Sequence, residues 1–248
     1  ERLFHRRNLG LFMVLTGVCL LCLALMSDFG TAAIFFVTFL VIAYMRSGDF
    51  ATLSLICGGA VFGAGIILKF KPYILSRFAS WGHAWEAAST TGYQQTRTMS
   101  AAASGGLFGT GPEDAWLKYV GAANTDLVFG VVSEEFGLLL ALVCVGAVIA
   151  LAVFALRSGD SARSGFYAIA ACAAASMLQT TLNVLGAVDI LPLTGVTFPF
   201  VSMGGSSMLS CWGLLAYLKA ADVRRPPEKE ISPPPKSEKT PERQEGFF

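Results

Sequence analysis

Three consecutive residues, Asn124, Thr125 and Asp126, stand directly before a long apolar segment. A hydroxyl or carboxylate in this position can accept hydrogen bonds from the free N–H groups of a helix and complement its dipole, so the residues by themselves favour a helix cap. A carboxylate at a membrane boundary can also act as a general base. The two roles are compatible, because a capping carboxylate can face a cavity. From the residues alone the cap is favoured, and a catalytic role for Asp126 as a base stays open.

Two further carboxylates, Glu134 and Glu135, follow about two turns later in the same predicted helix, roughly 12 Å beyond Asp126. An ionisable side chain inside a membrane span usually faces a cavity or a partner. At about 100° per residue, Glu134 lies about 80° around the axis from Asp126, whereas Glu135 lies on the far side. We expect Glu134 to face the cavity, with a purely helix-holding role as an equal alternative. For Glu135 the helix-holding role is preferred.

A glycine-rich stretch, SGGLFGTG at residues 104–111, lies in the long polar segment before these carboxylates. No strand precedes it and no Lys-Ser or Lys-Thr pair closes it, so a tight re-entrant turn is the simpler interpretation. Its backbone N–H groups, those of Gly105 and Gly106 among them, could still meet a diphosphate. Three cations of the same segment could pair with such an anion: Arg77, Arg97 and Lys118.

A second cluster of small and turn-forming residues occupies positions 191–207. Pro199 suits the start of a helix. Gly204, Gly205 and the serines after them allow close packing of membrane helices, which is the default interpretation, although Ser206 is kept as a candidate substrate contact. No serine nucleophile is predicted, because neither histidine of the chain has a matching arrangement.

The composition indicates that membrane helices position these residues. Hydrophobic residues make up 54% of the 248 and charged residues only 14%, against roughly 25% charged in a soluble domain. This composition excludes a soluble enzyme and a nucleic-acid binder with a basic face. The six cysteines lie in apolar runs without metal-ligand spacing, so neither a disulfide scaffold nor a cysteine metal site is expected.

We predict an all-α fold, a polytopic membrane helix bundle with six transmembrane helices and one large extracellular loop. A span needs about 20 mostly apolar residues, and the candidates are 9–27, 29–45, 51–68, 127–156, 164–188 and 198–218. They form one domain over residues 1–220. The loop, residues 69–126, is expected to contain short helices on the outer membrane face. Residues 221–248, rich in Pro, Glu, Lys and Ser, are predicted to form a disordered cytoplasmic tail.

The distribution of basic residues predicts the orientation. Arginines at the N-terminus, Arg46, the stretch from Arg157 to Arg163 and the residues after Leu218 occupy alternate connections, which the positive-inside rule assigns to the cytoplasm. Both termini are then cytoplasmic. The turn at Asp28, the large loop and the segment near Asp189 face outward. The polar chemistry of the chain is therefore expected on the outer face.

Four groups of residues, taken in order, resemble the motifs of one family, the SEDS proteins (shape, elongation, division and sporulation; the FtsW/RodA/SpoVE group). Each is short, but together they span residues 27–207 at the spacing of the family. They are Ser27–Ala32; Gly92–Gln94 with Ser104–Gly109; Thr125–Phe129 with Glu134–Gly137; and Asn183 with Leu191–Ser207.

The sequence also departs from the family pattern. Gly121–Asn124 replaces the usual proline-glutamate-x-histidine, and Asn124 can form a hydrogen bond but cannot take up a proton. Ser27 replaces a proline, Thr194 a frequent lysine, and Met203 a tyrosine. The family has ten spans, of which this chain would supply the last six.

The resemblance implies a peptidoglycan glycosyltransferase of the bacterial cytoplasmic membrane. Its substrate would be lipid II, the undecaprenyl-diphosphate-linked disaccharide-pentapeptide, and its partner a class B penicillin-binding protein. Asp126 matches the family's essential aspartate, proposed to deprotonate the acceptor's 4-hydroxyl. The leaving diphosphate needs cationic stabilisation, with a divalent cation as one source. The candidate substrate-binding residues are Arg77, Arg97, Lys118, Gly105, Gly106, Thr125, Glu134 and Ser206.

Two alternatives remain open at this point. A lipid II transporter or flippase would use Glu134 and glycine-rich helices in a gated path, although the charges gather on the outer side and do not line a route across the membrane. A non-catalytic scaffold of the division or elongation machinery would use the charged, Pro-rich tail to bind cytoplasmic partners. The sequence does not distinguish elongation, division and sporulation.

Overall fold

The computed structural model describes residues 14–23, 25–26, 28–47, 50–70, 78, 81–159 and 166–223. Within them all regular structure is helical, as predicted. The elements are α2 (Phe29–Ser47), α3 (Phe50–Phe70), α5 (Tyr93–Gly105), the 3-10 helix η1 (Leu117–Tyr119), α6 (Val128–Phe136), α7 (Leu138–Gly159), α8 (Phe166–Ala187) and α9 (Gly205–Val223). An apolar helix over Val14–Leu23 precedes them.

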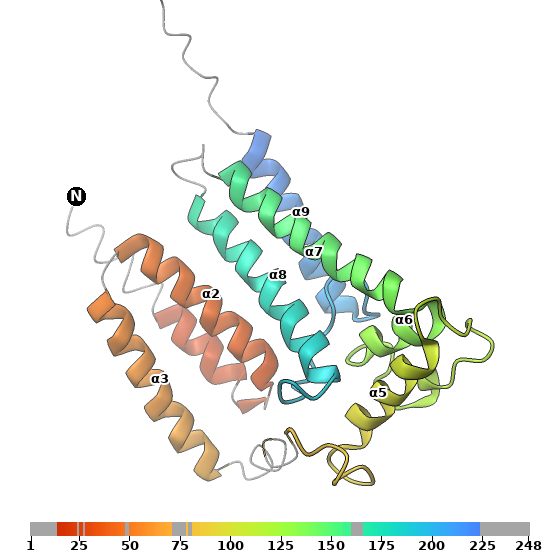
Figure 1. The fold of residues 1–248 in the computed structure, drawn as a ribbon. Coiled ribbons are helices and arrows are strands. Elements are labelled where there is room, and N and C mark those ends of the chain that lie inside the picture. Colours follow the sequence, from red (N-terminus) through yellow and green to blue (C-terminus); the bar gives the residue numbers. More distant parts are fainter. Residues whose placement is uncertain are drawn as a thin grey trace, which may run out of the picture.

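Helix α8 is the centre of the bundle. It packs between α2 and α7, while α3 flanks α2 and α9 lies beside α7 and α8 (Figure 1). Its buried face is made of small residues, with Ala170, Ala171 and Ala173 at most 6% exposed. Small side chains let helix backbones approach closely, which is how membrane helices gain packing energy. Helices α5 and α6 gather at one end of the bundle (Figure 1).

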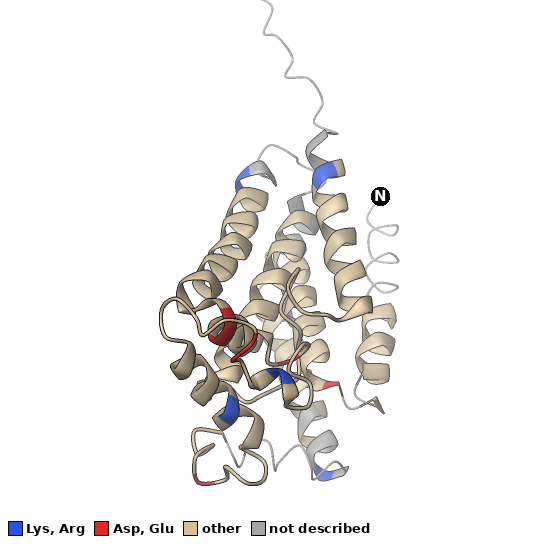
Figure 2. Cartoon of the chain, turned by 90° about the vertical axis from the view of Figure 1, so that its right-hand side faces the viewer, with Lys and Arg blue, Asp and Glu red and all other residues tan. Residues whose placement is uncertain are grey.

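Two helices, Leu138–Arg157 and Ile169–Ala187, are long and apolar enough to cross a membrane. Shorter apolar helices cover Val14–Leu23, Phe29–Met45 and Leu53–Gly63. The charged residues of the described part of the chain lie towards the two ends of the bundle, and the middles of the long helices contain none (Figure 2). At the start of α2, the Asp28 carboxylate accepts the N–H of Thr31 at 3.0 Å and so caps the helix.

Helices α2, α3 and α8 coincide closely with the predicted segments 29–45, 51–68 and 164–188. The single helix expected over 127–156 is wrong. It is divided into α6 and α7 by Gly137, whose φ of +91° and ψ of 161° are incompatible with a continuing helix. The helix expected from residue 198 begins only at Gly205, because residues 198–202 form a turn in which Phe200 has a φ of +63°.

The glycine-rich stretch fills the break between α6 and α7. The N–H groups of Thr110 and Gly111 donate to the carbonyls of Glu134 and Glu135 at 2.8 and 3.0 Å, which satisfies the end of α6. The N–H of Leu138, the first residue of α7, donates to the carbonyl of Gly106 at 3.0 Å. A helix break leaves backbone groups without intrahelical partners, and here one loop supplies partners for both ends. The stretch is therefore a tight turn that stabilises the junction of α6 and α7.

The loop predicted over 69–126 contains α5 and η1, in agreement with the expectation of short helices there. Its aromatic segment 81–92 is fastened to the C-terminal end of α8 by Asp189. The carboxylate accepts the N–H groups of Gly82 and Ala84, each at 3.1 Å, and the side-chain amide of Gln95 of α5 at 3.0 Å. The predicted tail beyond Val223, and the span residues 9–13, lie outside the described residues.

Candidate functional site

Asp126 lies two residues before the first residue of α6, at the end of the bundle that holds α5. The N-cap position of α6 is Leu127, whose side chain makes no cap hydrogen bond, so the predicted cap falls one residue later than Asp126. The hydroxyl of Thr125 donates to the carbonyl of Ala122 at 3.2 Å. The Asp126 side chain is partly buried and lies against Gly195, where an added Cβ would be 3.1 Å from Oδ2.

The backbone of Asn124, Thr125 and Asp126 is held by three hydrogen bonds from the C-terminal part of the chain. The carbonyl of Asn124 accepts the N–H of Met203 at 2.9 Å, and that of Thr125 accepts the Ser202 hydroxyl at 2.6 Å. The carbonyl of Asp126 accepts the side-chain amide of Asn183, in α8, at 2.9 Å. Each of the three carbonyls therefore has a partner that is distant in sequence.

Asn183 is the central residue of this arrangement. It is 1% exposed, and its amide also donates to the carbonyl of Val196 at 2.7 Å, so one side chain joins Asp126 to the segment that contains Gly195. Its Oδ1 is buried without a hydrogen-bond partner among the described residues. Helix α2 supports the same segment from the other side, since a Cβ on Gly30 would lie 2.2 Å from the Val196 side chain.

Ser202 orders its own turn as well as the aspartate segment. Its hydroxyl oxygen accepts the N–H of Phe198 at 2.7 Å and donates to Thr125 at the same time. The two motifs that stand 77 residues apart in the sequence, around Thr125 and around Ser202, are therefore one structural unit. Neither motif by itself predicts this contact. The occurrence of both motifs in one chain is the only sequence feature that indicates it.

Glu134 is 1% exposed, and both of its oxygens accept backbone N–H groups. Oε1 accepts the N–H of Trp116 at 3.0 Å, and Oε2 that of Leu117 at 2.9 Å. These are free donors at the start of η1, which a carboxylate can satisfy in the same way as at a helix N-terminus. These bonds give Glu134 a structural role and not the predicted cavity position, although the segment that it holds is the loop at η1 and not a neighbouring long helix.

The predicted cations take different positions. Arg97 is exposed on α5, with its guanidinium 5.2 Å from the ring centroid of Tyr93 and 5.9 Å from that of Trp116. Lys118, in η1, donates to the carbonyl of Pro112 and lies 5.4 Å from the ring centroid of Tyr119. Arg77 lies outside the described residues.

Trp116 links two of these features, because its ring lies beside Arg97 while its N–H is bound by Glu134. Aromatic faces attract cations and help to fix them. Glu134 therefore contributes to the position of Arg97 through Trp116. No feature of the sequence predicted this role of Trp116 or of Tyr93.

Gly105 and Gly106 serve packing in this structure. A Cβ on Gly105 would lie 2.2 Å from the carbonyl oxygen of Ser133, so the glycine is what permits α5 to touch α6. The N–H of Gly106 donates to Ala103 at 3.3 Å and that of Gly109 to Gly105 at 2.8 Å. These two N–H groups, like those of the two residues that follow Gly109, are bound to protein carbonyls and do not form a diphosphate cradle.

Ser206 is exposed in the first turn of α9. The neighbouring Ser207 enters a polar network instead. The amide of Gln179, in α8, donates to the hydroxyls of Thr197 at 2.9 Å and Ser207 at 3.2 Å, and these two hydroxyls are 2.5 Å apart. The network ties α8 and α9 together close to the Asp126 segment. Within the described part of the chain, no three His, Cys, Asp or Glu side chains are grouped so as to hold a metal ion.

Residues 2–225 match the family of cell cycle proteins that comprises FtsW, RodA and SpoVE. The chain belongs to this family. Members of the FtsW/RodA/SpoVE family sit in the membrane, which agrees with the apolar composition and the long apolar helices. The resemblance inferred from four short motifs is confirmed.

Several relatives in the family are similar along most of this chain. It is 33% identical over 226 residues to the probable peptidoglycan glycosyltransferase FtsW of Tolumonas auensis, with 87% of this chain and 59% of the relative covered. It is 32% identical to the peptidoglycan glycosyltransferase RodA of Mycobacterium leprae, with 77% and 42% covered. The chain thus spans about half the length of the curated relatives that it matches.

A chain in a solved peptidoglycan synthase complex has the same fold. It aligns with a TM-score of 0.66 at 19% identity, and the alignment covers 87% of this chain and 62% of that one. At this identity the likeness concerns the fold alone. It agrees with the all-α bundle described above.

Proposed function

We propose that the protein is a peptidoglycan glycosyltransferase that polymerises lipid II into glycan strands at the outer face of the bacterial cytoplasmic membrane. The glycosyltransferase names of the FtsW and RodA relatives support this function. The main structural observation in support of this function is that Asp126 combines a partly exposed side chain with a fixed backbone. Its carboxylate is partly exposed beside Gly195, while its backbone is fixed by Asn183 and its neighbours by Ser202 and Met203.

A general base must be held within hydrogen-bond reach of the proton that it removes, and its support must be rigid. In the proposed reaction, Asp126 takes the proton of the acceptor's 4-hydroxyl. The oxygen of that hydroxyl then bonds to the anomeric carbon of the donor sugar, and the bond from this carbon to the diphosphate oxygen breaks. Undecaprenyl diphosphate leaves with the bonding electron pair. Asp126 retains the proton until it is released to water.

The departing diphosphate carries negative charge, which fixed cations stabilise. Arg97 is the described cation best suited to this task, because it is exposed and its guanidinium is flanked by the rings of Tyr93 and Trp116. An arginine can bind phosphate oxygens in a bidentate manner. Lys118 lies in the adjacent η1 helix, and Arg77 remains a prediction from the sequence.

We place the end of the bundle that holds Asp126, α5 and α6 outside the membrane's hydrocarbon core, facing the periplasm or the exterior. Six spans then come from the apolar helix at Val14–Leu23, from α2, α3, α7, α8 and α9, and both termini are cytoplasmic. Helix α6, with its nine residues, is too short to cross a bilayer and lies at the outer boundary. The partner proposed for cross-linking is a class B penicillin-binding protein, in keeping with the synthase complex that shares this fold.

The variant Asp126→Asn tests the proposed function. It keeps the volume and hydrogen-bonding capacity of the side chain but lacks a base, so lipid II polymerisation should fall by about 10²- to 10⁴-fold, the usual contribution of general base catalysis. Glycan chain growth from labelled lipid II measures it in membranes that contain the full-length protein.

Asp114→Asn is the matched control, because Asp114 is an exposed carboxylate of the same loop. It should polymerise lipid II at the wild-type rate, and both variants should insert equally into membranes. Normal glycan growth by Asp126→Asn would contradict the proposal. Loss of lipid II reorientation with intact glycan growth would favour a transporter.

A further inference from the structure

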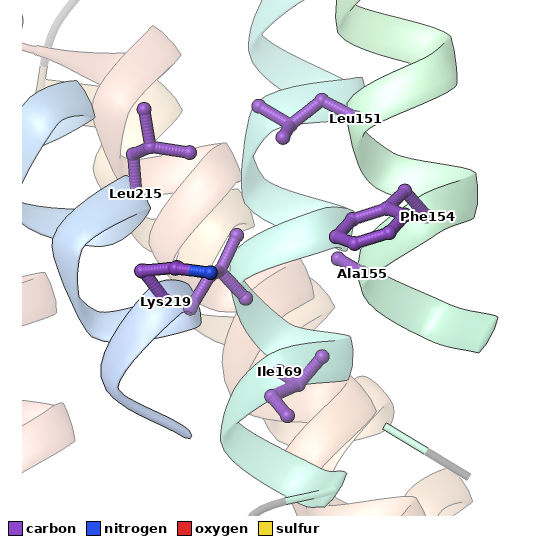
Figure 3. Close-up of a pocket in the computed structure, with 7 residues that line it drawn as sticks. Leu151, Phe154, Ala155, Ile169, Leu215 and Lys219 are labelled. Carbon is purple, nitrogen blue, oxygen red and sulfur yellow. The ribbon is translucent and has the colours of Figure 1, made fainter. Parts of the chain in front are cut away.

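A cleft of about 90 Å³ lies between α7, α8 and α9, at the end of the bundle remote from Asp126. Its walls include Leu151, Phe154 and Ala155 of α7, Ile169 of α8, and Leu215 and Lys219 of α9 (Figure 3). Ile169 precedes Asn183 by about four helical turns, or roughly 21 Å along α8. The cleft is therefore separate from the candidate catalytic site and is not used by the proposed reaction.

The packing of the three helices explains why a gap exists there. Helices α7 and α8 approach closely through the small residues Ala152, Ala155 and Ala173, which are buried against Ile169. Helix α9 is tied to α8 at the opposite end, where Gln179 donates to Ser207. Near the cleft, α9 presents long side chains, which leave space between them and the close-packed pair. The gap opens where α7 ends and α8 begins.

The chemistry of the walls selects the occupant. All the lining residues are apolar except Lys219, whose side chain lies across the cleft (Figure 3). An acyl chain matches the apolar walls, and a lysine near a helix end extends its charge towards the lipid headgroups. Arg157 provides a second cation in the last turn of α7. Basic pockets between membrane helices on the cytoplasmic side bind anionic headgroups.

The sequence reinforces this charge pattern. Arg163 stands between α7 and α8, and Arg224 and Arg225 follow α9 directly. The stretches 157–163 and 219–225 also contain Asp160 and Asp222, but each still carries a net positive charge. The described carboxylates of the candidate site belong to the opposite end of the bundle. An occupant with a negative headgroup is favoured over a neutral one.

We propose that this cleft binds an anionic phospholipid of the cytoplasmic leaflet. One acyl chain lies against Leu151, Phe154 and Leu215, and the phosphate pairs with Lys219 and Arg157. The site rests on the proposed orientation but not on the glycosyltransferase reaction, so it can fail or succeed independently of Asp126.

Native mass spectrometry of the full-length protein, titrated with phosphatidylglycerol or with phosphatidylcholine of the same acyl chains, tests the site. We expect phosphatidylglycerol to bind more tightly than phosphatidylcholine.

Lys219→Gln should weaken phosphatidylglycerol binding about fivefold, the contribution of one lysine near an anionic lipid. Lys69→Gln is the matched control, because it makes the same change on exposed Lys69 in the last turn of α3 and should bind as the wild type. Leu215→Trp should weaken binding by filling the cleft.

Three results would overturn the proposal. Equal binding of the two lipids would show that the headgroup charge is not recognised. Wild-type binding of phosphatidylglycerol by Lys219→Gln would remove Lys219 from the site. Displacement of bound phosphatidylglycerol by an equal concentration of undecaprenyl phosphate would assign the cleft to an isoprenyl lipid instead.

Discussion

Asn183 is the residue that holds Asp126 itself, whereas Ser202 and Met203 hold the two residues before it. One amide group donates to the carbonyls of Asp126 and Val196, which belong to segments on either side of the carboxylate. Asn183 stands in an apolar helix, and its type in isolation indicates only a polar contact within the membrane. Asn183 is part of the family motif, but the motif does not predict the two carbonyls to which its amide donates.

Asn183→Leu should lower the kcat of lipid II polymerisation at least tenfold while leaving the KM largely unchanged. The substitution keeps the branched shape and the number of side-chain heavy atoms but removes both donors, so the Asp126 segment loses its fixed position and not its substrate contacts. Gln179→Leu is the control, because Gln179 lies about one turn earlier in α8 and bonds to Thr197 and Ser207 instead. Equal losses of kcat in the two variants would argue for a general effect on stability.

Glu134 shows where helical geometry stops being informative. The predicted angle to Asp126 indicated a position facing a cavity, whereas the actual partners of Glu134 are two N–H groups of the loop, at Trp116 and Leu117. A loop contact of this kind has no periodicity. It could not be predicted from the spacing of the residues along α6.

Glu134→Gln should reduce the free energy of unfolding by about 1–3 kcal/mol, because the amide NH₂ group faces a backbone donor and leaves it unsatisfied. Thermal unfolding in detergent measures this loss, and limited proteolysis should cut within residues 106–120 sooner than in the wild type. Glu135→Gln, on a partly exposed neighbour, is the control for the charge change. A Glu134→Gln protein of unchanged stability that no longer polymerises lipid II would restore the predicted substrate contact.

Among the elements, the break between α6 and α7 is the feature that hydropathy did not predict. Residues 138–157 have a mean hydropathy of 3.0, and an apolar run that continues into them from residue 127 resembles one long helix. Glycine is frequent in membrane helices, so Gly137 is not in itself a signal of a break. The cause is tertiary: the backbone of Leu107 passes within 2.2 Å of where a Cβ on Gly137 would be.

Gly137→Ala should destabilise the protein by several kcal/mol and disrupt the attachment of the glycine-rich stretch. Its φ of +91° is strained for alanine, and the new methyl group meets backbone, which cannot move aside cheaply. Gly146→Ala, in the middle of α7 with nothing within 4 Å of its Cβ, should be neutral or stabilising by about 0.5–1 kcal/mol. Thermal unfolding of both variants compares the two glycines. Equal stability would mean that the break tolerates a side chain.

For the whole molecule, composition predicted more than any motif did. The share of charged residues excluded a soluble domain, and the apolar segments predicted the positions of α2, α3 and α8 closely because each of these helices is mostly apolar and has no charged residue in its middle. The turn before α9 was missed because Pro199 is a favoured first residue of a helix, whereas in this chain it precedes Phe200 with a positive φ. The hydrogen bonds of Ser202 stabilise the turn there, and they outweigh the preference of Pro199 for a helix start.

The orientation of the whole molecule can be tested with two cysteine substitutions in a variant whose six native cysteines are replaced by alanine. Glu113 is exposed in the loop beside η1, and Arg157 is exposed in the last turn of α7, at the opposite end of the bundle. If basic residues face the cytoplasm, a membrane-impermeant maleimide should label Glu113→Cys in intact cells but should label Arg157→Cys only after permeabilisation.

The reverse pattern would place Asp126 in the cytoplasm, where it could not extend a glycan strand on the outer face, and would move the phospholipid cleft to the outer leaflet. The same two variants therefore constrain both proposals at once, because Asp126 and the cleft lie at opposite ends of α8.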